Sequence, residues 1–215
     1  MGSFQGALAS IGACELGAEA IKSAVSRAGL GDKLDLVDEV LMGNVLSAGL
    51  GQSPASTAAR LAGLPPNIPT TIVNKVCASG MKAVTLAAAS IRAGQSNVVI
   101  AGGMESMSRA PHLLLTSRTG TKFGDQTLVD SLRLDGLTDT ATGWGMGLCG
   151  EKCASDYEIS RELSDEYAQR SYERAIAAKA HLVEEIAPVY VPAGKGQTIA
   201  VAMDEGPNNV CLGKP

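Results

Sequence analysis

One cysteine stands between a β-branched run and a long alanine-rich segment. Cys77 lies in the sequence VNKVCASGMK, after a strand predicted over residues 69–73 and before a helix predicted over residues 78–93. The start of a helix presents unpaired N–H groups and a partial positive charge, which favour a thiolate. The small residues 78–80 leave room for a substrate carbonyl. The pattern indicates a nucleophilic cysteine for acyl transfer, although the same spacing also fits a small buried cysteine that only packs.

The other sulfur and imidazole groups offer less chemistry. Cys149 and Cys153 are four residues apart on a predicted helix, but two ligands do not make a zinc site, which needs three or four. We therefore interpret this pair as packing residues and predict no metal site. His112 and His181 are expected to be solvated or structural.

Alternating patterns predict the elements that position Cys77. Helices are expected over residues 16–28, 54–62 and 78–93, and strands over residues 37–45, 69–73 and 97–101. In the last helix, Met81, Val84, Ala88 and Ile91 recur at helical spacing. The run NVVIA predicts a strand buried on both faces that stops before Gly102 and Gly103. This alternation is typical of an α/β fold with a helix-covered, mostly parallel sheet.

The second part of the chain is more polar and less regular. Residues 1–110 hold 8 basic and 7 acidic side chains, and residues 111–215 hold 10 and 15. This shift suggests a boundary near residues 105–111. Beyond it, helices are predicted over residues 146–159 and 164–180, and strands over residues 186–191 and 198–203.

Composition excludes several classes of protein. The 215 residues carry a net charge of −4, are 45% hydrophobic and only 3% aromatic, so neither a basic surface nor a base-stacking platform for nucleic acid is expected. No apolar run approaches the roughly 20 residues that span a bilayer. Five irregularly spaced cysteines and no visible signal peptide favour a soluble protein of a reducing compartment, cytoplasmic or mitochondrial.

The segment NKVCASGMKA, residues 74–83, resembles the nucleophile motif of the thiolases of the acetoacetyl-CoA (biosynthetic) type. Further segments resemble the same family in the same order: residues 1–8, 42–54, 101–108, 135–139 and 146–147. The resemblance implies a thiolase-like layered fold. It assigns residues 1–104 to an incomplete N-terminal thiolase domain and residues 105–215 to part of an irregular α+β loop domain, with the C-terminal thiolase domain absent. The family's first strand would precede Met1, which predicts two unpaired strand edges.

The resemblance also implies roles for single residues. Cys77 would accept the acyl group, and its N–H would contribute to an oxyanion hole. Leu137, Met146 and Tyr172 map onto positions that contact coenzyme A. The coenzyme A thioester is the substrate, so no cofactor and no metal are implied. The expected partners are acetyl-CoA or acetoacetyl-CoA and further copies of the chain in a dimer or tetramer, with no nucleic acid and no membrane.

The sequence also departs from the family pattern. The Gly-His-Pro and Cys-x-Gly-Gly-Gly motifs, which supply the base for the nucleophile and a second cysteine, do not occur. Gly145 stands where acetoacetyl-type members usually carry histidine, and Lys152 where asparagine is common. These differences bear on the identity of the substrate more than on membership of the family.

Three hypotheses follow. The first is an acyltransferase that condenses two acetyl-CoA molecules, or runs the reverse thiolysis, through an acyl-cysteine, and that is impaired in this form. The second is a non-enzymatic truncated product that associates with full-length subunits or does not fold stably. The third, another condensing enzyme such as a ketoacyl synthase, is disfavoured by the sequence KVCASGM.

Overall fold

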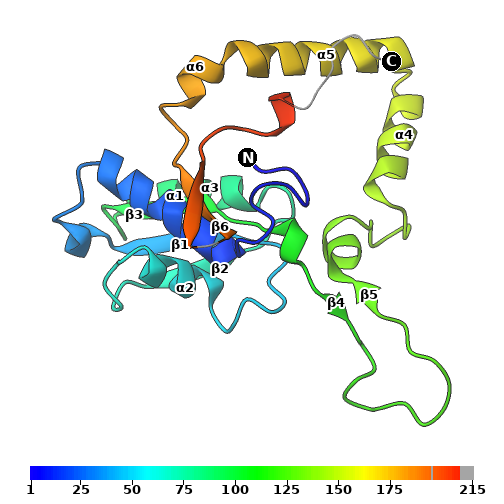
Figure 1. The fold of residues 1–215 in the computed structure, drawn as a ribbon, viewed down its shortest axis with the longest axis horizontal. Helices are drawn as coiled ribbons and strands as arrows, with labels where there is room; N and C mark the ends of the chain where they lie inside the picture. Colours follow the sequence, from blue (N-terminus) through cyan, green and yellow to red (C-terminus); the bar gives the residue numbers. More distant parts are fainter. Residues whose placement is uncertain (195, 209–215) are drawn as a thin grey trace. The chain divides into compact units, whose positions relative to one another are not determined.

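The computed structural model describes residues 1–194 and 196–208, which form two compact units (Figure 1). One unit is Ser10–Gly136. The other combines Met1–Ala9 with the described part of Leu137–Pro215. Each unit is considered by itself below. The assignment of residues 1–104 and 105–215 to family domains stays a prediction.

The unit Ser10–Gly136 is built on a three-stranded parallel sheet in the order β2-β1-β3. Its strands are β1 (Glu39–Gly43), β2 (Thr70–Val73) and β3 (Val99–Gly103), and its helices are α1 (Ala13–Arg27), α2 (Pro54–Leu61) and α3 (Ser79–Arg92). Val40 is paired with Thr70 on one side and with Ile100 on the other. The predicted α/β class is confirmed. Within the described sheet, β1 is hydrogen-bonded on both sides, and β2 and β3 are each paired on one side. The two unpaired edges expected from a missing central strand stay a prediction.

Helices cover both faces of this sheet. Side chains of a strand alternate between faces, so Val40 and Met42 point into a cluster with residues of α1 and α2, whereas Leu41 packs with Ala83 and Ala87 of α3. All three β1 side chains are at most 5% exposed. Strand β1 is therefore the strand buried on both faces.

Strand β3 differs from the prediction in two ways. It continues through Gly102 and Gly103 instead of stopping before them, because Met42 and Gly43 are their partners in β1. Its first four residues are half-buried and Gly103 is exposed, so the strand is not fully buried. The physical reason is its position at the edge of the described sheet, where only one side is paired.

Helix α3 packs on the sheet through its small residues. Ser79, Ala83 and Ala87 are buried, whereas Met81 and Val84 are 73% and 52% exposed. The large apolar residues that recur at helical spacing are thus on the outer side of the helix. The inner side carries small side chains because the helix lies close to the strands at its first turn.

Three glycines form that close approach. A Cβ built on Gly43 at the end of β1 would lie 2.5 Å from Gly80 N and 2.5 Å from Ser79 C, and one built on Gly103 would lie 3.3 Å from Gly80 Cα. Real Cβ atoms essentially never come as near to backbone as 2.5 Å, and 3.3 Å is closer than most of their contacts. The absence of side chains at these positions lets the start of α3 rest directly on the carboxyl ends of β1 and β3.

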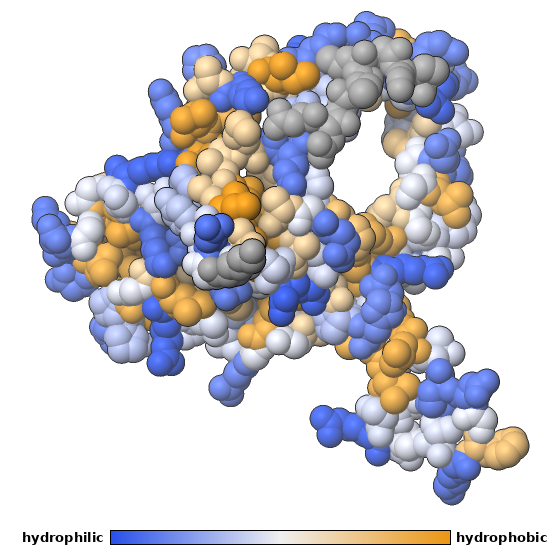
Figure 2. Space-filling view, in the orientation of Figure 1, coloured by the Kyte–Doolittle hydropathy of each residue, from blue (hydrophilic) through white to orange (hydrophobic). Residues whose placement is uncertain are grey.

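The remaining elements of this unit are short. They are the 3-10 helices η1 (Leu34–Leu36) and η2 (Met107–Arg109), the antiparallel pair β4 (His112–Leu113) and β5 (Val129–Asp130), and the π-helix η3 (Leu132–Gly136). Residues 115–128, which link β4 to β5, are exposed throughout. Figure 2 shows hydrophobic side chains gathered near the β4–β5 pair and mainly hydrophilic ones along the connecting loop.

The described residues of the second unit form helices and one hairpin. They are α4 (Met146–Asp156), α5 (Arg161–Ala177), α6 (Lys179–Leu182), and the antiparallel strands β6 (Val189–Gly194) and β7 (Gln197–Val201), followed by η4 (Gly206–Asn208). Helix α5 begins three residues before the predicted start, because Ser160 caps it by accepting a hydrogen bond from Leu163 N at 3.2 Å. The Glu205 carboxylate accepts bonds from Ser3 N and Ala7 N and so ties the first residues to this unit.

No helix within residues 1–194 and 196–208 combines the length and the hydropathy needed to cross a membrane.

The close approach of α3 can be tested with a single methyl group. We expect Gly43→Ala to lower the free energy of unfolding by about 1–3 kcal/mol, because the new Cβ meets backbone that must move. Gly31→Ala is the matched control, since a Cβ there meets nothing within 4 Å. Urea unfolding of both variants measures the difference. Equal stabilities would show that the first turn of α3 is not held against the strand.

Candidate active site

Cys77 lies in a turn between the carboxyl end of β2 and the first turn of α3. Its thiol is free and the residue is exposed. Helix α3 begins at Ser79 with Ala78 as the N-cap, so Cys77 precedes the helix by two residues instead of touching it as predicted. The exposure contradicts the alternative in which Cys77 is a small buried packing residue.

Side chains on both sides of Cys77 hold this turn. Asn74 Oδ1 accepts a hydrogen bond from Val76 N at 3.0 Å. The hydroxyl of Ser79 accepts one from Lys75 N at 2.9 Å and donates one to Val76 O at 2.5 Å. Ser79 is 4% exposed, so its hydroxyl is shielded from water and both bonds are part-buried. Together they fix the backbone on the two residues before the thiol.

The residue immediately before the thiol has an unusual backbone conformation. Val76 has a φ of +48°, in the left-handed region that β-branched residues avoid. Such a conformation costs on the order of 1–3 kcal/mol and persists only where the surroundings impose it. The bonds from Asn74 and Ser79 supply that constraint. Cys77 directly follows this constrained residue and is exposed.

The carboxyl ends of the neighbouring strands are joined by a second set of bonds. Asn44, after β1 and 1% exposed, donates to Met104 O at 3.1 Å and to Glu105 Oε1 at 3.0 Å. The other oxygen of Glu105 accepts from Val45 N at 2.8 Å, and Asn44 N donates to Val73 O at 3.1 Å. Ligands of parallel sheets bind at this edge, so Cys77 stands where substrate is expected.

Sequence reasoning did not identify these supporting residues. Asn44 and Glu105 fell within segments that resemble the family, but no role was assigned to either. The available signal was a polar residue within two positions after each of two strand ends that finish in glycine, Asn44 after Gly43 and Glu105 after Gly103. Only the pairing of β1 with β3 shows that the two side chains meet.

In the other unit, Leu137 and Met146 close a tight hairpin loop. Met146 N donates to Leu137 O at 3.0 Å and Asp139 N donates to Trp144 O at 2.8 Å, while Thr138 and Gly145 form an isolated antiparallel bridge. Leu137 is 43% and Met146 42% exposed. The structure therefore brings these two predicted site residues together at the start of α4, with apolar surface open to solvent.

The carboxylate of Asp139 fastens the tip of this loop. It accepts hydrogen bonds from Thr142 Oγ1 at 2.6 Å and from Thr142 N at 2.8 Å. These bonds favour the charged form, and the pKa of Asp139 is accordingly lowered from its ordinary value, first by the Thr142 side chain and then by its backbone.

The other predicted groups stand apart from these arrangements. Tyr172 lies on α5 and is 39% exposed. Cys149 and Cys153 carry free thiols on α4, and His112 and His181 are exposed. Within the described residues, no group of three or more His, Cys, Asp or Glu side chains could hold a metal ion. Cys211 lies outside the described residues. The structure describes Cys77 in one unit and Leu137, Met146 and Tyr172 in the other.

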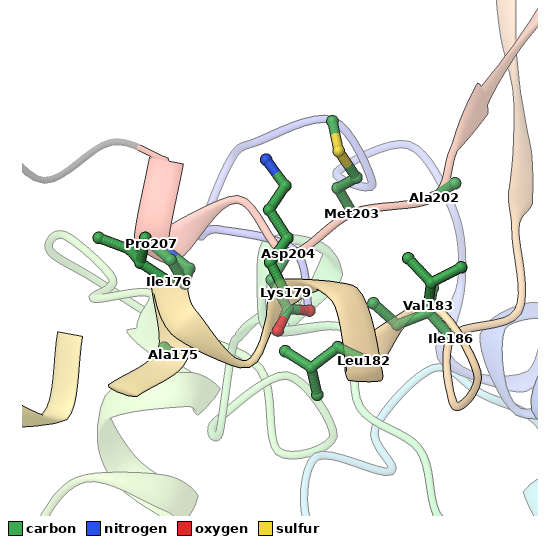
Figure 3. Close-up of a pocket in the computed structure, with 10 residues that line it drawn as sticks. All are labelled: Ala175, Ile176, Lys179, Leu182, Val183, Ile186, Ala202, Met203, Asp204 and Pro207. Atoms are coloured by element: carbon green, nitrogen blue, oxygen red, sulfur yellow. The ribbon is translucent and has the colours of Figure 1, made fainter. Parts of the chain in front are cut away.

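A cavity of about 280 Å³ lies in the second unit between α5, α6 and the residues after β7 (Figure 3). Its lining is mainly aliphatic, with Lys179 and Asp204 as its charged residues. None of the four predicted site residues lines it. The candidate nucleophile is therefore the Cys77 turn of the unit Ser10–Gly136.

Comparison with known proteins agrees with the motif around Cys77. The family model of the thiolase N-terminal domain matches residues 1–212. The chain belongs to the thiolase family. This confirms the resemblance drawn from residues 74–83 and the layered α/β fold that it implies.

Several proteins that the chain resembles are named acetyl-CoA acetyltransferase. The chain is 50% identical over 216 residues to the cytosolic enzyme ERG10 of Gibberella zeae, covering 100% of the chain and 54% of that relative. It is 50% identical over 209 residues to acetyl-CoA acetyltransferase 2 of Arabidopsis thaliana, covering 96% and 51%. It is 49% identical over 213 residues to the mitochondrial enzyme erg10A of Aspergillus fumigatus, covering 98% and 48%. The chain spans about half the length of these curated relatives.

The hydrogen bonds that Ser79 makes in the Cys77 turn give a stability prediction. We expect Ser79→Ala to lower the free energy of unfolding by about 1–3 kcal/mol, because the Lys75 N–H loses its acceptor in a shielded site. Thr85→Ala is the control on the same helix, where an exposed hydroxyl donates to Lys82 O. Urea unfolding distinguishes the two. If Ser79→Ala lowered the free energy of unfolding no more than Thr85→Ala, the stabilising role of the Ser79 hydrogen bonds would be contradicted.

The hydrogen bonds from Thr142 to the Asp139 carboxylate give a prediction about pH. Because its pKa is lowered in the folded chain, its bonds are fully present above the unfolded pKa of about 4 and are lost as the pH falls through the lower folded value. We expect the emission of Trp144, the single tryptophan, to shift only in that acidic range. Asp139→Asn should remove this shift, with circular dichroism monitoring global unfolding in parallel. An unchanged pH profile in Asp139→Asn would contradict the assignment.

Proposed function

We propose that this chain carries the acyl-accepting part of a thiolase, in which Cys77 takes an acetyl group from acetyl-CoA. The observation that carries the proposal is the exposed Cys77 thiol, presented by a strained turn at the carboxyl edge of the sheet. The names of the relatives support acetyl-CoA as the donor.

The proposed step is a simple thioester exchange. The Cys77 thiol gives its proton to water, its sulfur attacks the carbonyl carbon of acetyl-CoA to form a new carbon–sulfur bond, and the bond to the sulfur of coenzyme A breaks. Coenzyme A leaves as a thiolate and takes up a proton from water, so the exchange consumes no net proton. The N–H of Cys77 and the first turn of α3 are proposed to stabilise the oxyanion that develops on the carbonyl oxygen.

We further propose that coenzyme A is held by Leu137, Met146 and Tyr172. The support is the closed loop that sets Leu137 beside Met146 with both side chains part-exposed. The thioester is itself the substrate, and the step above uses no cofactor and no metal.

The complete reaction is proposed for the whole protein. Condensation of two acetyl-CoA molecules to acetoacetyl-CoA, or the reverse thiolysis, also needs a base and a second cysteine, and the Gly-His-Pro and Cys-x-Gly-Gly-Gly motifs do not occur in this sequence. Loss of a general base typically costs about 10²- to 10⁴-fold in rate. We therefore propose that the 215-residue chain is acylated but impaired in turnover.

The setting of the protein is proposed from the same relatives. Cytosolic and mitochondrial members are both among them, which supports an intracellular protein of one of these compartments. We propose a homo-oligomer, dimer or tetramer, with residues 1–104 in the N-terminal thiolase domain and residues 105–215 in the loop domain. No nucleic acid or membrane is proposed as a partner.

One observation favours a second candidate function. The outer side of α3 exposes Met81, Val84 and Ile91, and an apolar helix face of this kind is typical of a surface that another polypeptide covers. This supports a non-enzymatic product that associates with full-length subunits.

Acylation of the purified chain separates the two candidates. With acetyl-CoA we expect a mass increase of one acetyl group, located on Cys77 by peptide mass spectrometry. Cys77→Ala should abolish it, and Cys153→Ala, which removes another exposed free thiol, should retain it. A folded chain that is never acylated would favour the non-enzymatic product. Robust thiolysis of acetoacetyl-CoA by this chain alone would contradict the proposed impairment.

A further inference from the structure

A second reactive group lies on the same turn as the Cys77 thiol. We propose that the ε-amine of Lys75 takes the acetyl group from acetylated Cys77, which makes Lys75 a self-acetylation site of this chain. The inference rests on the proposed function, because the acetyl group must first be carried by Cys77.

One tight turn holds Lys75 and Cys77. Ala78 N donates to Lys75 O at 3.1 Å, which closes a four-residue β-turn. Val76 and Cys77 are its two central residues. Lys75 N donates to the Ser79 hydroxyl at 2.9 Å, so both backbone polar groups of Lys75 are bonded. Two residues of chain span at most about 7 Å, which places Cys77 within reach of an amine carried on four methylenes.

The two side chains that would react are open to solvent. Lys75 and Cys77 are both exposed, whereas Lys82, the next lysine along the chain, is half-buried on α3. Exposed side chains change rotamer on the picosecond to nanosecond timescale. The Lys75 amine can therefore meet a thioester on Cys77 without any movement of the backbone.

No carboxylate holds the Lys75 amine away from the thiol. Residues 61–104 contain three basic and no acidic side chains. None of the ion pairs found within the described residues includes Lys75. An ammonium group without an ion pair reaches its neutral, nucleophilic form without first breaking a salt bridge.

The proposed step is the aminolysis of a thioester. The Lys75 ammonium gives one proton to water, because only the neutral amine has a lone pair with which to attack. Its nitrogen attacks the acetyl carbonyl carbon, a carbon–nitrogen bond forms, and the bond to the Cys77 sulfur breaks. The second proton leaves the nitrogen and passes to the departing sulfur. The products are acetyl-lysine and the restored thiol, with one proton released to water.

The composition of this chain favours the transfer. Condensation would consume acetylated Cys77, but it needs a base and a second cysteine whose motifs do not occur in this sequence. The acetyl group then leaves Cys77 only to water, to coenzyme A or to a neighbouring nucleophile. An amine two residues away has a high effective concentration. The amide that forms is more stable than the thioester, and its formation removes the charge of Lys75 beside the thiol.

Mass spectrometry of the 215-residue chain with acetyl-CoA tests the transfer. Cys77 should gain an acetyl group first and Lys75 later, after which the restored thiol is acetylated again. Hydroxylamine added at each time point cleaves thioesters and spares amides, so no transfer continues during digestion. Since proximity accelerates the reaction, acetylation of Lys75 should exceed that of Lys33, an exposed lysine of the same unit, by more than about tenfold. Its rate should not depend on the concentration of the chain.

Two variants locate the donor and the acceptor. Cys77→Ala should lower the acetylation of Lys75 to the level of Lys33, because it removes the thioester. Lys75→Arg keeps the charge but offers no nucleophilic amine, so it should prolong the lifetime of acetylated Cys77. Lys33→Arg is the matched control and should not change that lifetime.

The outcomes separate this inference from the proposed function. Acetylated Cys77 that decays equally fast in the wild type and in Lys75→Arg, with no acetyl-Lys75, would overturn the inference and leave the function standing. Acetylation of Lys75 that persists in Cys77→Ala would also overturn it, since the group would then come directly from acetyl-CoA, as would transfer to Lys82 instead. A folded wild-type chain in which Cys77 is never acetylated would overturn both.

Discussion

The direct contact between the first turn of α3 and the ends of β1 and β3 is the constraint on which the candidate site depends. Gly43, Gly80 and Gly103 bring backbone against backbone with no room for a Cβ at Gly43. This contact fixes where α3 begins, and therefore where the turn before it must pass. Cys77 is presented at the sheet edge because the helix cannot move outward without losing the packing of Ala83 and Ala87.

In the turn before Cys77, side-chain hydrogen bonds hold a backbone conformation that is intrinsically unfavourable. Val76 adopts a conformation that its branched side chain disfavours, and the hydroxyl of the buried Ser79 bonds both Lys75 N and Val76 O. Strain of this kind persists only where surrounding bonds outweigh it, and it is concentrated at functional sites. The hydrogen bonds between Asn44, Val45 and Glu105 hold the segments that follow the adjacent strands β1 and β3.

In the second unit, the 137–146 loop is ordered by hydrogen bonds and not by a buried core. It is closed by two backbone bonds and by the Asp139 carboxylate. Closure leaves Leu137, Trp144 and Met146 at about two-fifths exposure.

The sequence by itself determined the order and type of the elements around Cys77, since β-branched runs, helical spacing and glycine stops are local signals. It also placed Cys77 between strand and helix, and its motif determined the family. Only the tertiary structure decided that α3 turns its small residues inward and Met81 outward, that β3 continues through Gly103 at an edge, and that Asn44 meets Glu105. These features depend on which strands are neighbours and how closely a helix approaches them, and such contacts join residues tens of positions apart that no local pattern relates.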